Sequence, residues 1–172
     1  TPCWAAARYR WTCWKHVWTA GWLTSNKEYT LSNPDNSTQH GQCLCGAVQF
    51  DAKNVATDFH ACHCAMCRRW AGGPLFAADA ESVTFSGEEN LQRYASSEWA
   101  ERGFCRQCGS NLFYFLKPTG AYHLCVGAFD NAAAFKIASE IFVDQQPAGY
   151  AFSGQHPRLT EQQVLAQFSG ED

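Results

Sequence analysis

The chain of 172 residues lacks the features of a nucleic-acid-binding or membrane protein. Its formal net charge is -3 and its pI is about 6.0, so it has no excess of basic residues for a phosphate backbone. It has no apolar run near the ~20 residues that cross a bilayer, and no stretch with the pattern of a secretory signal. We therefore expect no nucleic-acid partner, no membrane partner and a location in the reducing cytoplasm.

Several common catalytic patterns are also missing. The sequence has no internal repeat, no glycine-rich phosphate-binding loop and no Ser/His/Asp arrangement of recognisable spacing. Its composition, 46% hydrophobic and 15% aromatic residues, is typical of one globular domain rather than of a disordered chain. The cysteines remain as the feature that carries chemistry.

Seven of the ten cysteines fall into three clusters. A structural zinc site usually has four protein ligands, whereas a reactive zinc has three protein ligands and an open fourth position. Seven clustered cysteines therefore predict two zinc ions, one in a closed site and one in an open site. The clusters are Cys43-Leu44-Cys45, Cys62-His63-Cys64-Ala65-Met66-Cys67 and Cys105-Arg106-Gln107-Cys108.

The outer two clusters pair with each other on the basis of their spacing. Cys105 and Cys108, followed by Gly109, form the turn of a zinc knuckle, which supplies two sulfurs. Cys43 and Cys45 supply two more from a segment flanked by glycines, whose backbone can fold around a metal. These four cysteines are predicted to form the closed, structural zinc site.

The middle cluster is then left to form the open site. In an extended segment alternate side chains share a face, so Cys62 and Cys64 point to one side and His63 to the other. We expect Cys67 to close the same site from the first turn of a short helix over residues 65–71. A zinc on these three cysteines would keep one position for an incoming ligand.

Disulfide bonds are the alternative use of the cysteines. Disulfide-dense chains are usually small secreted domains, and sulfurs one residue apart pair poorly with each other. Cys3, Cys13 and Cys125 belong to no cluster. Cys125 lies in the apolar run 122–129, where we expect it to be a small buried hydrophobic residue.

Taken in order, residues 41–48, the middle cluster and residues 103–110 resemble the family of glutathione-dependent formaldehyde-activating enzymes and centromere protein V. The resemblance covers about residues 41–156, including residues 96–102 and 140–144. It implies a small mainly β zinc-binding fold of the β-tent type. It also implies the same division of ligands: a structural zinc on Cys43, Cys45, Cys105 and Cys108, and a second zinc on Cys62, Cys64 and Cys67.

The resemblance further implies a zinc-dependent carbon–sulfur lyase that acts on a thiol–aldehyde adduct, of the S-(hydroxymethyl)glutathione synthase type. Glutathione and formaldehyde come from the resemblance, whereas the residues alone predict only a zinc that accepts a thiol. A metal deprotonates a coordinating thiol, and the thiolate is the competent nucleophile. The alternative is a non-catalytic, zinc-stabilised binding module or a thiol carrier.

Charged residues near the clusters have two possible roles each. Arg68, Arg69 and Arg102 could receive the carboxylates of a glutathione-like ligand, because a guanidinium matches a carboxylate with two hydrogen bonds. For each of them, a surface or strand-face arginine is the simpler interpretation. Glu98 and Glu101 could carry protons, although a solvated charge on a strand is the simpler interpretation.

Two histidines and three aromatic residues complete the candidates. His63 and His123 could relay protons beside a zinc site. Because His63 should face away from the metal, we expect it to be a hydrogen-bonded structural residue. Trp70, Phe76 and Phe104 are expected to build the core. No residue outside the cysteines receives a catalytic assignment from the sequence.

The chain divides near His40. Residues 1–39 form a Trp-rich extension that ends in a polar linker, and we assign it no function. Four of its tryptophans recur at helical spacing, so a helix packed on the domain or on a membrane surface is the alternative. Residues 40–158 form the zinc domain. Residues 159–172 form a C-terminal helix and tail, begun by a Thr-x-x-Gln capping box at Thr160.

From Ala47 onward, short segments rich in β-branched and aromatic residues alternate with Gly, Asn, Asp and Ser. This pattern predicts a mainly β, antiparallel fold with short helices, whose modest core the metals would reinforce. The expected strands are residues 47–51, 58–61, 75–79, 83–86, 92–95, 100–104, 111–115, 122–127 and 136–143.

Overall fold

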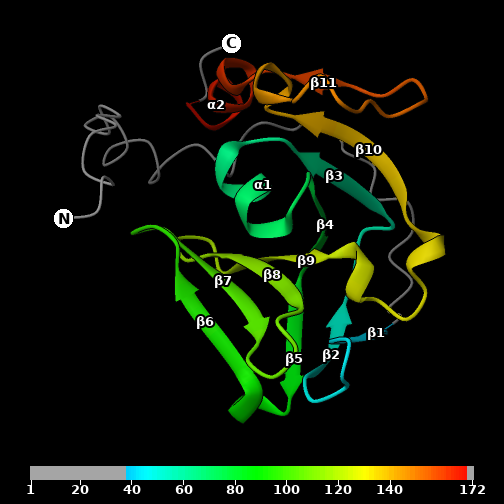
Figure 1. The fold of residues 1–172 in the computed structure, drawn as a ribbon, viewed down its shortest axis with the longest axis vertical. Helices are drawn as coiled ribbons and strands as arrows, with labels where there is room; N and C mark the ends of the chain where they lie inside the picture. The colour runs from blue at the N-terminus through cyan, green and yellow to red at the C-terminus, as the bar shows by residue number, and fades with distance from the viewer. Residues whose placement is uncertain (1–37, 170–172) are drawn as a thin grey trace.

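The computed structural model describes residues 38–169 (Figure 1). In this part of the chain the strands form a three-stranded sheet and an eight-stranded sheet, so the mainly β prediction is confirmed. The predictions for residues 1–37, which include the tryptophans of the extension, Cys3 and Cys13, lie outside the described residues.

The three-stranded sheet is antiparallel and consists of β1 (Thr38–Gln42), β2 (Gln49–Lys53) and β5 (Ser82–Ser86). Buried and exposed residues alternate along β2, as expected of a strand with one face in the core. β1 was not predicted, because its residues are mostly polar. It is a strand because it pairs along its whole length with β2, from Thr38 opposite Lys53 to Gln42 opposite Gln49.

The eight-stranded sheet has the order β11-β10-β3-β4-β9-β8-β7-β6. Most of its pairings are antiparallel, as predicted, but β10 runs parallel to both β3 and β11. A parallel pair needs a long crossover, and here the chain between β3 and β10 provides one. The strands are β3 (Asp58–Cys62), β4 (Leu75–Ala80), β6 (Leu91–Ala95), β7 (Ala100–Cys105), β8 (Asn111–Leu116), β9 (Ala121–Cys125), β10 (Lys136–Ile141) and β11 (Arg158–Leu159).

The main hydrophobic core lies between the two sheets. Phe50 of β2 and Phe113 of β8 are each at most 2% exposed. The Phe50 ring packs edge-on against Phe129, with ring centroids 5.2 Å apart. Gly103 of β7 leaves the space that Phe113 fills, because a Cβ at this position would overlap the phenyl ring. The core therefore covers the inner face of the large sheet, and other elements can pack on its outer face.

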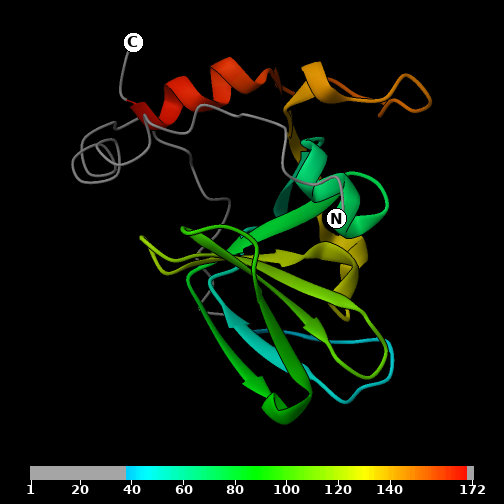
Figure 2. The same cartoon turned by 60° about the vertical axis from the view of Figure 1, so that its left-hand side comes forward.

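The helix α1 (Ala65–Ala71) covers part of that outer face and has the bounds predicted from the sequence. Cys64 is its N-cap, and the Cys64 sulfur accepts a hydrogen bond from the Cys67 N–H at 3.4 Å. Gly72 ends the helix in the left-handed conformation, with φ of 75°. Figures 1 and 2 show α1 between the strands β7–β9 and the C-terminal elements β11 and α2.

The second helix, α2 (Glu161–Ser169), begins with the predicted capping box. The Gln163 N–H donates to Thr160 Oγ1 at 3.3 Å, and the Thr160 N–H donates to Gln163 Oε1 at 2.8 Å. Val164 of this helix is buried. Neither described helix has the length and hydropathy of a membrane-spanning segment.

Candidate metal centres

The first cysteine site joins the two outer clusters. The sulfurs of Cys43, Cys45, Cys105 and Cys108 all lie within 4.8 Å of one another. The Cys43 and Cys45 sulfurs are 3.5 Å apart, and those of Cys45 and Cys105 are 3.8 Å apart. A tetrahedral zinc with bonds of about 2.3 Å separates its sulfur ligands by about 3.8 Å, so this donor set fits a zinc ion with four protein ligands.

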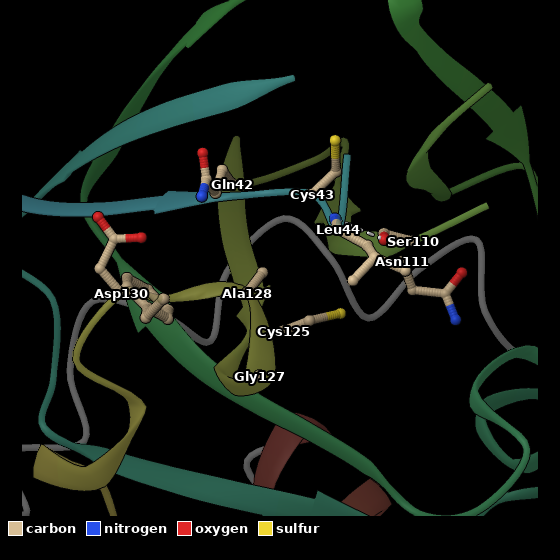
Figure 3. A pocket seen from close by; sticks show the side chains of 10 residues that line it. Gln42, Cys43, Leu44, Ser110, Asn111, Cys125, Gly127, Ala128 and Asp130 are labelled. Atoms are coloured by element: carbon tan, nitrogen blue, oxygen red, sulfur yellow. Dashed lines mark hydrogen bonds between the residues drawn. The ribbon is translucent and has the colours of Figure 1, made fainter. Parts of the chain in front are cut away.

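Two tight turns shape this site. Gly46 and Gly109 have φ of 74° and 76°, the left-handed region in which glycine carries no steric penalty. The Gly109 N–H donates to the Cys105 carbonyl at 2.8 Å and closes the predicted knuckle. The Leu44 N–H donates to Ser110 Oγ at 3.0 Å, which ties the two cysteine loops together (Figure 3).

The second cysteine site is built where β3 passes into α1. The sulfurs of Cys62, Cys64 and Cys67 lie within 4.8 Å of one another, and no fourth Cys, His, Asp or Glu of the described residues belongs to the group. Hydrogen bonds from the Cys62 and Cys67 thiols lower the pKa of Cys64. Because the Cys62 thiol donates its proton in these hydrogen bonds, the pKa of Cys62 is raised. This donor set fits a metal ion with three thiolate ligands.

Arg102 of β7 lies directly against this second site. Its side chain is buried, and its Nη2 donates to the Cys67 sulfur at 3.5 Å. Two aromatic rings flank the guanidinium: the centroid of Tyr114 is 5.1 Å from its central carbon and that of Trp70 is 5.8 Å away. The positive charge of the Arg102 guanidinium therefore faces the three sulfurs of this site.

A row of polar residues extends from Arg102 across the outer face of the sheet. Tyr114 is opposite Arg102 in the strand register, His123 is opposite Tyr114, and Asp79 is opposite His123. Burial raises the pKa of Tyr114 to about 12, so the phenol stays protonated. Burial alone would raise the pKa of Asp79, but the hydrogen bond from His123 has the larger effect, so the pKa of this carboxyl lies below its ordinary value.

His63 turns its ring away from the cysteines on either side of it, as predicted. Its Nε2 bonds to Glu140 Oε2 at 2.9 Å and its Nδ1 to the Tyr150 hydroxyl at 2.9 Å. Glu140 is fully buried and also accepts from His156 Nε2 at 2.8 Å and Arg158 Nε at 3.3 Å. Burial raises the pKa of Glu140, but hydrogen bonds from His156 and His63 outweigh burial and lower it.

This buried network was not found from the sequence. Its signal was an acidic residue, Glu140, inside the predicted strand that became β10, since a charge on a buried strand requires partners. The network matters to the second site because His63 is the residue between Cys62 and Cys64. The His63 N–H also donates to the Ile141 carbonyl at 3.0 Å, so both its ring and its backbone are held.

The other charged candidates contact the backbone or other charged groups, or lie on the surface. Arg68 Nε donates to the His63 carbonyl at 2.9 Å, whereas Arg69 is exposed. Glu98 is exposed. Glu101 forms ion pairs with Arg93 and Lys117, at 3.7 Å and 3.4 Å. These contacts give Arg68 and Glu101 structural partners and leave Arg69 and Glu98 on the surface.

Trp70 of α1 and Phe104 of β7 pack together on the outer face of the large sheet, whereas Phe76 of β4 packs against the main core. Trp70 meets Phe104 edge-on with centroids 5.5 Å apart, and Phe76 meets Phe152 at 5.4 Å. All three predicted residues are half-buried. Phe76 therefore packs against the core as expected, whereas Trp70 and Phe104 form a smaller hydrophobic contact at α1 and outside the main core.

An open pocket borders the first cysteine site (Figure 3). Its lining includes Leu44, Asn111 and Cys125. Asn111 Nδ2 donates to the Trp70 carbonyl at 2.9 Å, which joins the pocket wall to the end of α1. Cys125 is half-buried, not fully buried as predicted, because β9 ends there and the chain turns. Burial raises the pKa of its thiol to about 12.

Comparison with known proteins identifies the family. Residues 38–145, more than half of the chain, match the family described as glutathione-dependent formaldehyde-activating enzyme. The protein belongs to this family. The resemblance seen in the cysteine clusters is therefore confirmed, and the match begins at the first residue of β1.

Individual relatives extend this comparison. A Schizosaccharomyces pombe protein named as an uncharacterized lyase is 29% identical over 127 residues, which cover 73% of this chain and 93% of the relative. A Halomonas elongata protein, provisionally named a glutathione-dependent formaldehyde-activating enzyme, is 34% identical over 85 residues, 44% of this chain and 54% of that protein. A crystal structure of a Rhodobacter sphaeroides protein matches with a TM-score of 0.46 and 25% identity, over 69% of this chain and 98% of the other.

Proposed function

We propose that the protein is a zinc-dependent carbon–sulfur lyase of the S-(hydroxymethyl)glutathione synthase type. It would join a thiol to an aldehyde and catalyse the reverse cleavage as well. The observation that carries the proposal is the group of Cys62, Cys64 and Cys67, which no fourth described residue completes. Membership of the family and the names of the two relatives support the reaction class and the substrates, glutathione and formaldehyde.

The two cysteine sites would have different tasks. Cys43, Cys45, Cys105 and Cys108 would hold a structural zinc, because four ligands leave no position for a substrate. A second zinc held by three cysteines would supply one open position where an incoming thiol loses its proton and becomes a nucleophile. Arg102 offsets the negative charge of the sulfurs, since its guanidinium stays charged.

The proposed reaction forms one carbon–sulfur bond. The thiolate sulfur attacks the carbonyl carbon of the aldehyde, and the π electron pair of the C=O bond moves onto the oxygen. The oxygen then takes a proton from water and becomes the hydroxyl group of an S-hydroxymethyl thiol. The thiol has lost one proton and the oxygen has gained one, so the reaction is balanced without a redox partner.

The surroundings agree with a small-molecule thiol as the substrate. The open pocket borders the first cysteine site, and the hydrogen bond from Asn111 to the Trp70 carbonyl joins its wall to α1, the helix that carries Cys67. Its exposed apolar residue, Leu44, would contact the peptide part of a glutathione-like thiol. We also propose a cytoplasmic location, because a reducing compartment keeps seven clustered thiols free of disulfide bonds.

Cobalt substitution tests the proposal. Glutathione should add a sulfur-to-metal charge-transfer band to the spectrum of the cobalt protein, through the open position of the second site. With glutathione and formaldehyde, the protein should accelerate the approach to equilibrium over the spontaneous rate, measured by NMR. Cys64→Ala and Cys67→Ala should lose both effects and keep the other metal.

Met66→Ala is the matched control, because it removes an exposed sulfur-bearing side chain from the same helix without removing a predicted ligand. This variant should behave like the wild type. If no small thiol changes the cobalt spectrum, the open-site mechanism is wrong, and a non-catalytic zinc-stabilised binding module takes its place.

A further inference from the structure

Arg102 has a buried donor that nothing in the described part of the chain satisfies. Its side chain is 3% exposed, and its Nη1 has no hydrogen-bond partner. The carboxylates that form ion pairs within residues 38–169 pair with other cations. A buried, unsatisfied donor on a charged group is destabilising, so such a donor indicates a partner that binds during function.

The position of Arg102 restricts what this partner can be. Nη2 of the same guanidinium donates to the Cys67 sulfur at 3.5 Å. Nη1 and Nη2 are bonded to one carbon atom, so a group bound to Nη1 lies next to the cysteine sulfurs. The partner must therefore carry an acceptor very close to the reacting sulfur of the substrate.

A thiol–aldehyde adduct has such an acceptor. In the group S–CH2–OH the oxygen is two bonds from the sulfur, whereas the carboxylates of glutathione are many bonds away from its sulfur. The sequence suggested that Arg102 could receive a carboxylate, but its burial beside Cys67 fits the small oxygen better. The guanidinium is also held between the rings of Tyr114 and Trp70, so it is already oriented.

We infer that Arg102 binds the oxygen of the aldehyde and of the hydroxymethyl group formed from it. The inference rests on the proposed function and names a residue for its carbonyl step. As the thiolate attacks, the electron pair of the C=O bond moves onto the oxygen, and the hydrogen bond from Nη1 strengthens with the growing negative charge. Arg102 keeps its proton, and the oxygen is protonated by water.

A simpler role for Arg102 is to balance the charge of the thiolates. Lysine at this position would preserve the charge but has a single donor nitrogen, so it could not bind the Cys67 sulfur and the substrate oxygen with the paired nitrogens of a guanidinium. Arg102→Lys therefore separates the two roles, and Arg102→Gln removes the charge while keeping a similar shape. Arg93→Gln is the matched control, because Arg93 also packs on aromatic rings, on the neighbouring strand, without a cysteine contact.

Equilibrium binding provides the measurement. The zinc-loaded protein is titrated with S-ethylglutathione, and separately with glutathione in excess formaldehyde, which presents a hydroxyl in place of the terminal methyl group. The wild type should prefer the hydroxymethyl adduct by about tenfold or more, the value of a hydrogen bond to a charged group. Arg102→Gln and Arg102→Lys should bind the two ligands about equally, while Arg93→Gln keeps the preference.

The kinetic readout is separate. Arg102→Gln and Arg102→Lys should both lower kcat by about 10²–10³-fold, as loss of one oxyanion donor does. Arg102→Lys keeps the positive charge, so it should leave the cobalt response to glutathione alone unchanged. Equal binding of both ligands by the wild type would overturn the inference, whether or not any variant folds. Retained preference in Arg102→Gln would also overturn it. A cobalt spectrum that does not respond to glutathione refutes the proposed function instead, so the two failures are distinguishable.

Discussion

Replacing Glu140 by alanine tests the buried network that holds the backbone of the second cysteine site. The Glu140 carboxylate is 0% exposed and has contacts with His63, His156 and Arg158. The side chain of His63 is also 0% exposed and that of His156 is 5% exposed. Alanine would remove the acceptor and leave buried imidazole N–H groups without partners.

The magnitude follows from the burial. Removing one member of a buried ion pair typically costs about 3–5 kcal/mol, because the remaining groups stay desolvated. We expect Glu140→Ala to lose a similar amount of unfolding free energy. In a domain of this size each kcal/mol shifts Tm by about 2–4 °C, so Tm should fall on the order of 10 °C. Glu140→Gln should lose less, since the amide keeps the size and one acceptor.

Thermal or urea unfolding at equal zinc concentration is the assay. Glu101→Ala is the control, because Glu101 also has two cationic partners, at 3.7 Å and 3.4 Å, but its side chain is 27% exposed. A partly exposed ion pair contributes under about 1 kcal/mol, so this variant should change little. Equal stabilities of Glu140→Ala and Glu101→Ala would refute the argument that the buried network stabilises the fold.

Three further predictions follow from the sites and the core. Elemental analysis should find two zinc ions per chain. Cys105→Ser should prevent folding, since binding of a structural zinc contributes on the order of 10–16 kcal/mol to the free energy of folding. Cys67→Ser should give soluble protein with one zinc. Collapse of both variants would contradict this division. Gly103→Ala should lose about 1–3 kcal/mol in urea unfolding, because its Cβ would overlap Phe113, whereas Gly149→Ala has open space and should not. The pKa of Glu140 is held below its ordinary value of 4.5, so the carboxylate should stabilise the fold fully above pH 4.5 and lose this effect in more acidic solution. The difference in unfolding free energy between wild type and Glu140→Gln should therefore shrink as the pH falls below 4.5.

The local elements of the fold could be predicted from the sequence because their signals are local. The cysteine spacing gave α1 its correct bounds, since Cys64 is both a cap and a predicted ligand. Segments rich in β-branched and aromatic residues, separated by Gly, Asn, Asp and Ser, located the strands from β2 to β10. The parallel pairing of β10 with β3 could not be predicted, because it depends on how distant segments pack. β1 was missed because its residues are mostly polar, and it forms a strand through its pairing with β2.

The same distinction applies to the candidate sites. Spacing alone grouped the seven cysteines as the structure brings them together, because each cluster is a short segment. The contact of Arg102 with Cys67 joins residues 35 positions apart, and that of His63 with Glu140 joins residues 77 positions apart. The sequence could name Arg102 and His63 as candidates. Only the folded sheet brings Arg102 of β7 to Cys67, and Glu140 of β10 to His63.

Strand β7 connects the two cysteine sites through the alternation of its side chains. Arg102 lies on the outer face against Cys67, and the next residue, Gly103, lies on the inner face against Phe113. The strand ends at Cys105, a predicted ligand of the structural zinc. A metal on the first site would therefore anchor the end of the strand that carries the arginine of the second. The closed site would then position the open one through the rigid backbone of β7, without any direct contact between the metals.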